Sequence, residues 1–142
     1  ISLVPYNLYG PNDNIGATGH VLAMLIEKHR KDNNVNIWGT GDARREFLHV
    51  DDLADAAIFL SKNFIMGIPI NVGYGSDITI RELAKLIGKT FKNFYTYKYD
   101  KIKPDGMKQK LLDSSLLNSM GWKPKISLKE GLKKVIYGKK DA

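Results

Sequence analysis

The chain has 142 residues, enough for one domain or for a large piece of one. With 43% apolar residues it can bury a core, and without cysteine it can form no disulfide and offer no thiolate. No apolar run approaches the roughly 18 residues of a membrane span, and no secretory signal is visible. We therefore expect a cytoplasmic protein without membrane contact. Because the chain opens on a strand-like run and not on Met, we also expect a piece of a larger protein.

The net charge of +7 raises the question of nucleic-acid binding. Residues 1–100 carry eleven Lys/Arg and eleven Asp/Glu, residues 101–122 four and two, and residues 123–142 seven and two. The excess is therefore concentrated at the C-terminal end. Lysines without interleaved aromatic residues are typical of a solvated helix face, so we expect no nucleic-acid partner.

Strand-like and helix-like segments alternate along the chain, which indicates an α/β fold. In the first half of the chain we predict a buried strand over 1–7, a loop over 8–17, a helix over 18–31, a strand over 35–38, a turn over 39–42, an extended segment over 47–50 and a helix over 53–62. In the second half we predict a strand over 68–73, a helix from about 80, an edge strand over 94–99 and a charged loop over 100–110. A short helix over 115–120 and a last helix to about 137 complete the chain.

Local signals mark three of the helix starts. T-x-x-E at residues 79–82 and S-x-x-E at residues 127–130 each precede an apolar run, the pattern of a capping box. Asp51 or Asp52 is predicted to cap the helix over 53–62, which is a better explanation of this pair than a catalytic one. No G-x-G-x-x-G follows the first strand, so the phosphate-binding end of a dinucleotide fold is missing from this sequence. No metal-ligand spacing is present, and we expect no metal.

Four blocks of sequence, in order and over nearly the whole chain, are similar to one protein family. They are P-Y-N-L-Y-G-P-N-D-N (5–14), W-G-T-G to R-E-F-L-H-V-D-D-L-A (38–54), I-N-V-G with T-I-R-E-L (70–83), and K-P-D-G with K-L-L-D and G-W-K-P (103–124). The middle blocks resemble extended short-chain dehydrogenases in general. The first block and K-P-D-G with K-L-L-D resemble the GDP-L-fucose synthases among them.

The resemblance implies that residues 1–142 are the C-terminal part of such an enzyme: the last Rossmann strand or strands plus the smaller α/β substrate-binding domain. It implies NADPH-dependent 3,5-epimerisation and 4-reduction of GDP-4-keto-6-deoxy-D-mannose to GDP-L-fucose, in a homodimer. The Gly-rich NADP-binding loop, a Ser/Tyr/Lys triad and a cysteine base are implied upstream of Ile1. We therefore expect this chain alone to be inactive.

His20 is the candidate catalytic residue. Taken alone, an isolated histidine at a helix start is more often a surface or capping residue, although an imidazole is also suited to general acid catalysis. The resemblance matches His20 to the family's epimerisation acid, which also lies near the nicotinamide. Pro5, Tyr6, Asn7 and Leu8 follow a strand end, where ligands of open α/β sheets bind, and the resemblance places them with His20 at the NADP site.

Five residues are candidates for the GDP-sugar site. Lys28 follows His20 by two helical turns and is expected to face the same cleft, within reach of a diphosphate. Arg45 carries the fork that suits a pyrophosphate, although an Arg45–Glu46 surface pair is the alternative. Trp38 would ordinarily be core, and the resemblance instead places it against the substrate. Asp105, otherwise a turn residue, and Lys110 lie in the loop that the resemblance places over the guanosine.

Two other functions remain open at this point. Another NAD(P)-dependent nucleotide-sugar epimerase or dehydratase would share the middle blocks, but it would not predict His20 or K-P-D-G. A nucleotide-sugar binding module without catalysis would share the binding residues. A reading of the upstream sequence for a G-x-x-G-x-x-G and a Y-x-x-x-K would separate the enzymes from the module.

Overall fold

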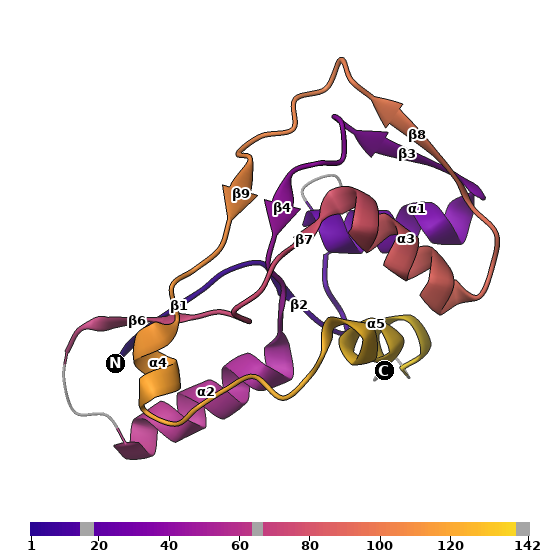
Figure 1. Cartoon of the computed structure of the whole chain (residues 1–142). Coiled ribbons are helices and arrows are strands. Elements are labelled where there is room, and N and C mark those ends of the chain that lie inside the picture. Colours follow the sequence, from indigo (N-terminus) through magenta and orange to yellow (C-terminus); the bar gives the residue numbers. More distant parts are fainter. Residues whose placement is uncertain (15–18, 64–66, 139–142) are drawn as a thin grey trace.

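The computed structural model describes residues 1–14, 19–63 and 67–138. Figure 1 shows two lobes of helices and strands joined by short strands. The first lobe contains β1 (Ser2–Pro5), β6 (Pro69–Val72), α2 (Val50–Asn63) and α4 (Ser115–Ser119). The second contains α1 (Val21–Lys31), β3 (Asn34–Trp38), α3 (Ile80–Phe91), β8 (Thr96–Asp100) and α5 (Leu128–Tyr137). The connecting strands are β2 (Leu8–Tyr9), β4 (Arg44–Arg45), β5 (Leu48–His49), β7 (Ile78–Thr79) and β9 (Gln109–Lys110).

Most strand pairs are parallel, as an α/β fold requires. β1 pairs with β6, β2 with β5, and β3 with β8, all in parallel. In the three-stranded sheet, β4 lies between β7, which is antiparallel to it, and β9, which is parallel. The position of β4 matters for function because it brings Arg44 and Arg45 between segments that lie far away in sequence.

Each lobe has its own hydrophobic core. In the second lobe, the apolar faces of α1, α3 and α5 meet the inward side chains of β3; the buried residues are Tyr9, Leu22, Leu25, Ile26, Val35, Ile37, Phe47, Leu83, Ala84, Ile87 and Leu132. In the first lobe, α2 and α4 cover β6; the buried residues are Leu48, Ala56, Leu60, Ile70, Val72, Leu117 and Trp122. The alternation of buried and exposed residues along β3 explains how one face of this strand forms the core while the other stays in solvent.

The helix starts confirm two of the three capping predictions. Thr79 caps α3 and Ser127 caps α5, each in a complete capping box with the glutamate three residues on. The third prediction is wrong, because α2 begins at Val50 and both aspartates lie in its first turn. The buried Asp52 carboxylate instead accepts hydrogen bonds of 3.0 Å from the backbone N–H groups of residues 125 and 126, which fasten the segment before α5 to α2.

Some of the strand predictions also need correction. The first strand is shorter than residues 1–7 and is not buried: Val4 is 39% exposed, because β1 pairs with β6 on one edge and is only partly covered. The predicted loop over 8–17 includes β2, while its residues 15–17 lie outside the described ranges. The predicted edge strand over 94–99 is β8, displaced by a residue or two, and the charged loop includes β9.

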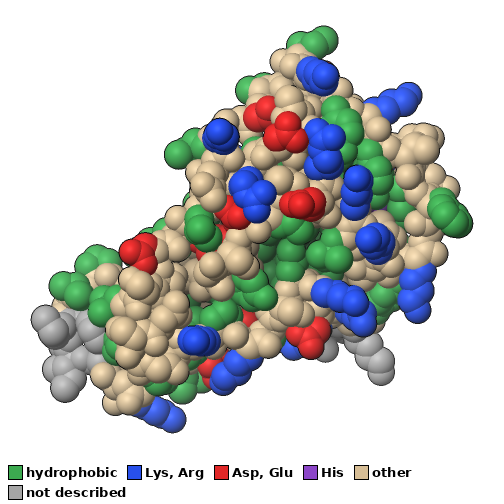
Figure 2. Space-filling model, viewed as in Figure 1, with side chains coloured by type: hydrophobic (Ala, Val, Ile, Leu, Met, Phe, Trp, Pro, Cys, Tyr) green, Lys and Arg blue, Asp and Glu red, His purple; other side chains and the backbone are tan. Residues whose placement is uncertain are grey.

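The surface is mixed in charge. Figure 2 shows basic and acidic side chains interspersed over one face, with apolar side chains exposed in a hollow between the lobes. Within the described residues, none of the helices has the length and apolar character needed to cross a bilayer.

Candidate functional site

Four of the five predicted substrate residues line one cavity, which we call the Trp38 cavity. It has a volume of about 300 Å³ and lies between α1, β3, β4 and the loop that precedes β9. Its lining residues are Gly19, Val21, Met24, Leu25, Lys28, Ile37, Trp38, Arg45, Ile80, Pro104 and Asp105. Apolar walls with a few convergent charged groups are typical of a small-molecule site.

Lys28 reaches this cavity from α1. Its Nζ atom donates a 2.7 Å hydrogen bond to the Asn36 carbonyl and lies 5.6 Å from the centre of the Trp38 ring. Partial burial lowers the pKa of the Lys28 ammonium, because desolvation disfavours its charged form. An anionic ligand bound here would therefore stabilise the charged form of Lys28, in place of the water that the ammonium has lost.

Trp38 ends β3 and is 55% exposed, so its interpretation as a core residue is wrong. Even-numbered positions of β3 point away from the core, and Trp38 is the last of them. A second ammonium, that of Lys103, lies 5.5 Å from the ring centre. An exposed indole flanked by cations can pack against a sugar or a base whose phosphates these cations bind.

Arg45 does not form the alternative ion pair with Glu46. Its Nη1 atom donates to the carbonyl of Arg44 at 2.6 Å and to that of Met107 at 2.7 Å. Glu46 directly follows β4 and is fully buried. The Glu46 carboxylate accepts hydrogen bonds from the backbone N–H groups of residues 74, 75 and 112. Arg45 is therefore held by backbone carbonyls and not neutralised by a carboxylate.

Asp105 lies opposite the turn that follows β3. Its Oδ1 atom accepts a 2.7 Å hydrogen bond from the backbone N–H of Thr40, and its Oδ2 atom accepts a 2.8 Å bond from the Thr40 hydroxyl. These bonds, the hydroxyl first, lower the pKa of the Asp105 carboxyl because they stabilise its ionised form. The sequence did not suggest Thr40; only the meeting of W-G-T-G with K-P-D-G in space reveals it.

The predicted cofactor residues lie apart from the Trp38 cavity. His20 is exposed at the N-cap position of α1 and makes no side-chain capping bond. It does not line the cavity, although its neighbours Gly19 and Val21 do. Lys110, the fifth predicted substrate residue, does not line the Trp38 cavity either. It lies with Tyr6 at a second hollow of about 390 Å³, and its Nζ atom is 5.3 Å from the centre of the tyrosine ring.

The segment Pro5–Leu8 runs from the end of β1 into β2. Asn7 has a positive φ of 44°, a conformation that asparagine tolerates better than most residues. Its side-chain Nδ2 atom is buried without a hydrogen-bond partner in the described part of the chain. A buried amide in this state is unusual, and a bound molecule could satisfy it. The end of a strand in a parallel pair is also where ligands of such sheets bind.

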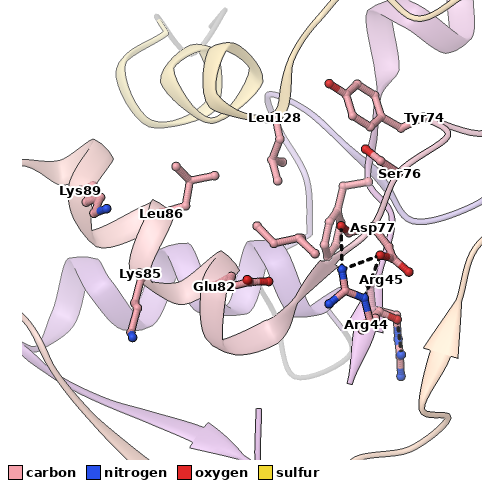
Figure 3. A pocket seen from close by; sticks show the side chains of 12 residues that line it. Arg44, Arg45, Tyr74, Ser76, Asp77, Glu82, Lys85, Leu86, Lys89 and Leu128 are labelled. Carbon is pink, nitrogen blue, oxygen red and sulfur yellow. Dashed lines mark hydrogen bonds and ion pairs between the residues drawn. The ribbon is translucent and has the colours of Figure 1, made fainter. Parts of the chain in front are cut away.

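A larger hollow, of about 570 Å³, lies beside α3 and α5 (Figure 3). Within it, Arg44 pairs with Asp77 at 2.8 Å, and Asp77 also accepts from the Gln109 side chain, so the pKa of the Asp77 carboxyl is lowered. Figure 3 shows Arg45 extending away from this pair, as alternation along a strand requires. Arg45 lines this hollow as well, but Arg44 is already paired with Asp77 here, and Lys28, Trp38 and Asp105 lie only at the Trp38 cavity, so the Trp38 cavity is the better candidate despite its smaller volume.

The other histidines contribute to packing. His29 is buried in the second lobe, where its Nδ1 atom lies 2.7 Å from the Leu25 carbonyl, and burial lowers its pKa. His49 is also buried, and desolvation lowers its pKa as well. Within the described ranges, no three His, Cys, Asp or Glu side chains are grouped so that they could hold a metal.

Comparisons with known proteins place these features in context. A sequence model of the NAD dependent epimerase/dehydratase family matches residues 1–73. The chain is 49% identical over 138 residues to a probable GDP-L-fucose synthase 1 of Oryza sativa subsp. japonica, covering 93% of this chain and 42% of the relative. It is 41% identical over 138 residues to the GDP-L-colitose synthase of Yersinia pseudotuberculosis, covering 92% and 45%. The chain thus spans less than half the length of these relatives.

Among solved structures, the chain is similar to MlghC, a GDP-mannoheptose C4 reductase from Campylobacter jejuni with NADP bound. The TM-score is 0.80 and the sequence identity is 35%, over 96% of this chain and 48% of that one. The similarity extends over both lobes, because nearly all of the chain is covered.

Proposed function

This chain belongs to the NAD dependent epimerase/dehydratase family, and we propose that it is the C-terminal, substrate-binding part of a GDP-L-fucose synthase. The observation that carries the proposal is the meeting of Lys28, Trp38 and Arg45 at one cavity, in a chain similar to proteins named GDP-L-fucose synthase. The Rossmann half that binds most of the cofactor would belong to the remainder of the protein. A cytoplasmic location and a homodimer stay predictions.

In the proposed complex, the diphosphate of the GDP-sugar binds between Lys28 and Arg45. Arg45 provides a planar donor fork, and Lys28 provides a point charge on the opposite wall. Trp38 packs against the sugar or the base. Asp105 borders the same cavity, while Lys110 extends the site toward Tyr6. The diphosphate thereby directs the sugar toward the start of α1, where His20 stands.

His20 is proposed to deliver the proton in epimerisation. Inversion at a carbon beside a ketone needs a base on one face and an acid on the other, and an exposed imidazole can approach a ring from solvent. NADPH, when bound, supplies the hydride that reduces the ketone. The residues at the end of β1 fit a cofactor, since the buried Asn7 amide lacks a partner in the described part of the chain. We propose that Asn7 borders the nicotinamide together with Pro5, Tyr6, Leu8 and His20.

The proposal is tested with His20→Gln in the full-length protein. Glutamine keeps hydrogen-bonding capacity but cannot deliver the proton, so formation of GDP-L-fucose should fall about 10²–10⁴-fold. In deuterated water, NMR should show deuterium entering at C3 and C5 with retained configuration, because the partner base still removes protons. Lys31→Gln, an exposed position on the same helix, serves as the control and should retain the rate.

Two results would contradict the proposal in different ways. Near wild-type synthesis by His20→Gln would make His20 a surface residue, the more common role of an isolated histidine at a helix start. A wild-type protein that binds the GDP-sugar without consuming NADPH would be a binding module. Product of a different stereochemistry would instead indicate another nucleotide-sugar epimerase or reductase of the same family.

A further inference from the structure

Residues 101–108, which we call the strap, border the Trp38 cavity between β8 and β9. All of them are exposed, so burial in a core does not hold the strap in place. Its C-terminal end is joined to β4 through the bond from the Arg44 N–H to the Lys108 carbonyl. The middle of the strap is held by the two Asp105–Thr40 hydrogen bonds, which join residues 65 positions apart.

The turn after β3 is shaped to receive Asp105. Gly39 has a φ of +75°, and a Cβ atom placed on it would collide with the Asp105 carboxylate. A residue without a side chain is therefore required at position 39 for the strap to come this close. The strap and the turn are complementary in shape as well as in hydrogen bonding.

The strap in this position orients Arg45. The Met107 carbonyl, together with that of Arg44, occupies the Nη1 atom of the guanidinium. Within the described residues, its Nε and Nη2 atoms make no hydrogen bond, and these two form the side-on edge that binds a phosphate through two parallel bonds. The same strap carries the Lys103 ammonium to 5.5 Å from the centre of the Trp38 ring, which the Lys28 ammonium approaches to 5.6 Å.

Building on the function proposed above, we propose that Thr40 and Asp105 form a clasp that positions Arg45 and Lys103 for the diphosphate of the nucleotide sugar. Asp105 is a positioning residue in this scheme, since both of its carboxylate oxygens are engaged by Thr40. Lys103 is a third cation of the diphosphate site, beside Lys28 and Arg45.

A double-mutant cycle in the full-length protein tests the clasp. Calorimetry would measure the Kd of GDP for the wild type, Thr40→Val, Asp105→Ala and the double variant. Loss of a hydrogen bond to a charged group at this exposed site should weaken binding about tenfold. Because Thr40 and Asp105 act through their contact with each other, the two effects should not add. The double variant should bind GDP as tightly as the single variant with the higher Kd. Thr40→Ser keeps the hydroxyl and should retain the wild-type Kd, and Lys103→Ala should also bind GDP more weakly.

Two further measurements separate positioning from general damage. The Kd of NADP⁺ should change less than that of GDP in every clasp variant, because none of the predicted cofactor residues lines the Trp38 cavity and only Tyr6 lies at a hollow that the strap borders, through Met107. Hydrogen exchange of residues 101–108 should accelerate in Asp105→Ala and in Gly39→Ala, which displaces the strap without removing a polar group. Gly121→Ala is the matched control: its φ is +100° and no atom lies within 4 Å of the added Cβ, so the strap should not respond.

Additive effects in the cycle, or a Thr40→Val variant that binds GDP like the wild type, would overturn the proposal and make Asp105 a direct ligand. Unchanged exchange of the strap in Asp105→Ala would overturn it too. GDP binding that depends on the clasp, without turnover of the keto-sugar, would support the clasp and refute only the proposed synthase activity. A wild type that binds no GDP would refute both.

Discussion

The buried carboxylate of Glu46 is expected to be a main stabilising feature at the junction of the two lobes. Its Oε2 atom accepts from the N–H groups of residues 74 and 75 at 3.0 and 3.3 Å, and its Oε1 atom accepts from that of residue 112 at 2.5 Å. Gly73 packs against it so closely that a Cβ there would lie 2.7 Å from Oε2. Two segments, residues 73–75 and the segment around residue 112, thus converge on one side chain that is 0% exposed.

Glu46→Gln tests this role with almost no change of shape. One of the two oxygens becomes an NH₂ group, so at least one buried N–H then faces a donor, at a cost of about 1–3 kcal/mol. The remaining hydrogen bonds lose their charge assistance, and each becomes weaker by about 1 kcal/mol. After local relaxation we expect a loss of about 3 kcal/mol in the free energy of unfolding, a large fraction of the stability of a domain.

Urea unfolding of the protein measures this loss, and hydrogen exchange of the peptides around residues 74 and 112 locates it. Glu130→Gln is the matched control, because Glu130 is an exposed capping-box glutamate and glutamine serves the same box. We expect the control to change the free energy by less than about 0.5 kcal/mol. Equal effects of the two substitutions would refute the argument, since they would show that burial and the three donors add nothing.

Other consequences follow from the same structure. Arg45→Ala should raise the Michaelis constant for the GDP-sugar about ten- to a hundredfold, and an unchanged constant would place the diphosphate elsewhere. GDP affinity should fall as the pH rises through the lowered pKa of Lys28, because only the ammonium binds an anion, and Lys28→Arg should abolish that decline. Burial lowers the pKa of His29, so the unfolded state binds more protons and stability should decrease as the pH falls below about 6.5; His29→Phe should show a flatter pH profile of stability. Leu83→Ala, at a fully buried position of α3, should cost about 2–5 kcal/mol in urea unfolding.

Features that depend on neighbours in sequence could be predicted without a structure. The capping boxes at Thr79 and Ser127 involve residues three positions apart, and both form as expected. The apolar spacing of α1 and the alternation of β3 likewise reflect periodicities of one helix or one strand. The resemblance to a family added the candidates Lys28, Trp38, Arg45 and Asp105, and the structure places these four at one cavity.

The contacts that hold the site together could not be read from the sequence. Thr40 meets Asp105 across 65 residues, Glu46 meets residue 112 across 66, and Asp52 binds the backbone of residue 125 across 73. The residues next to a polar side chain in sequence do not reveal a distant partner. From sequence alone, Asp105, Glu46 and Asp52 are therefore interpreted as turn, surface and capping residues. Only folding decides which carboxylates become buried, because a buried charge must find its hydrogen bonds wherever the chain returns.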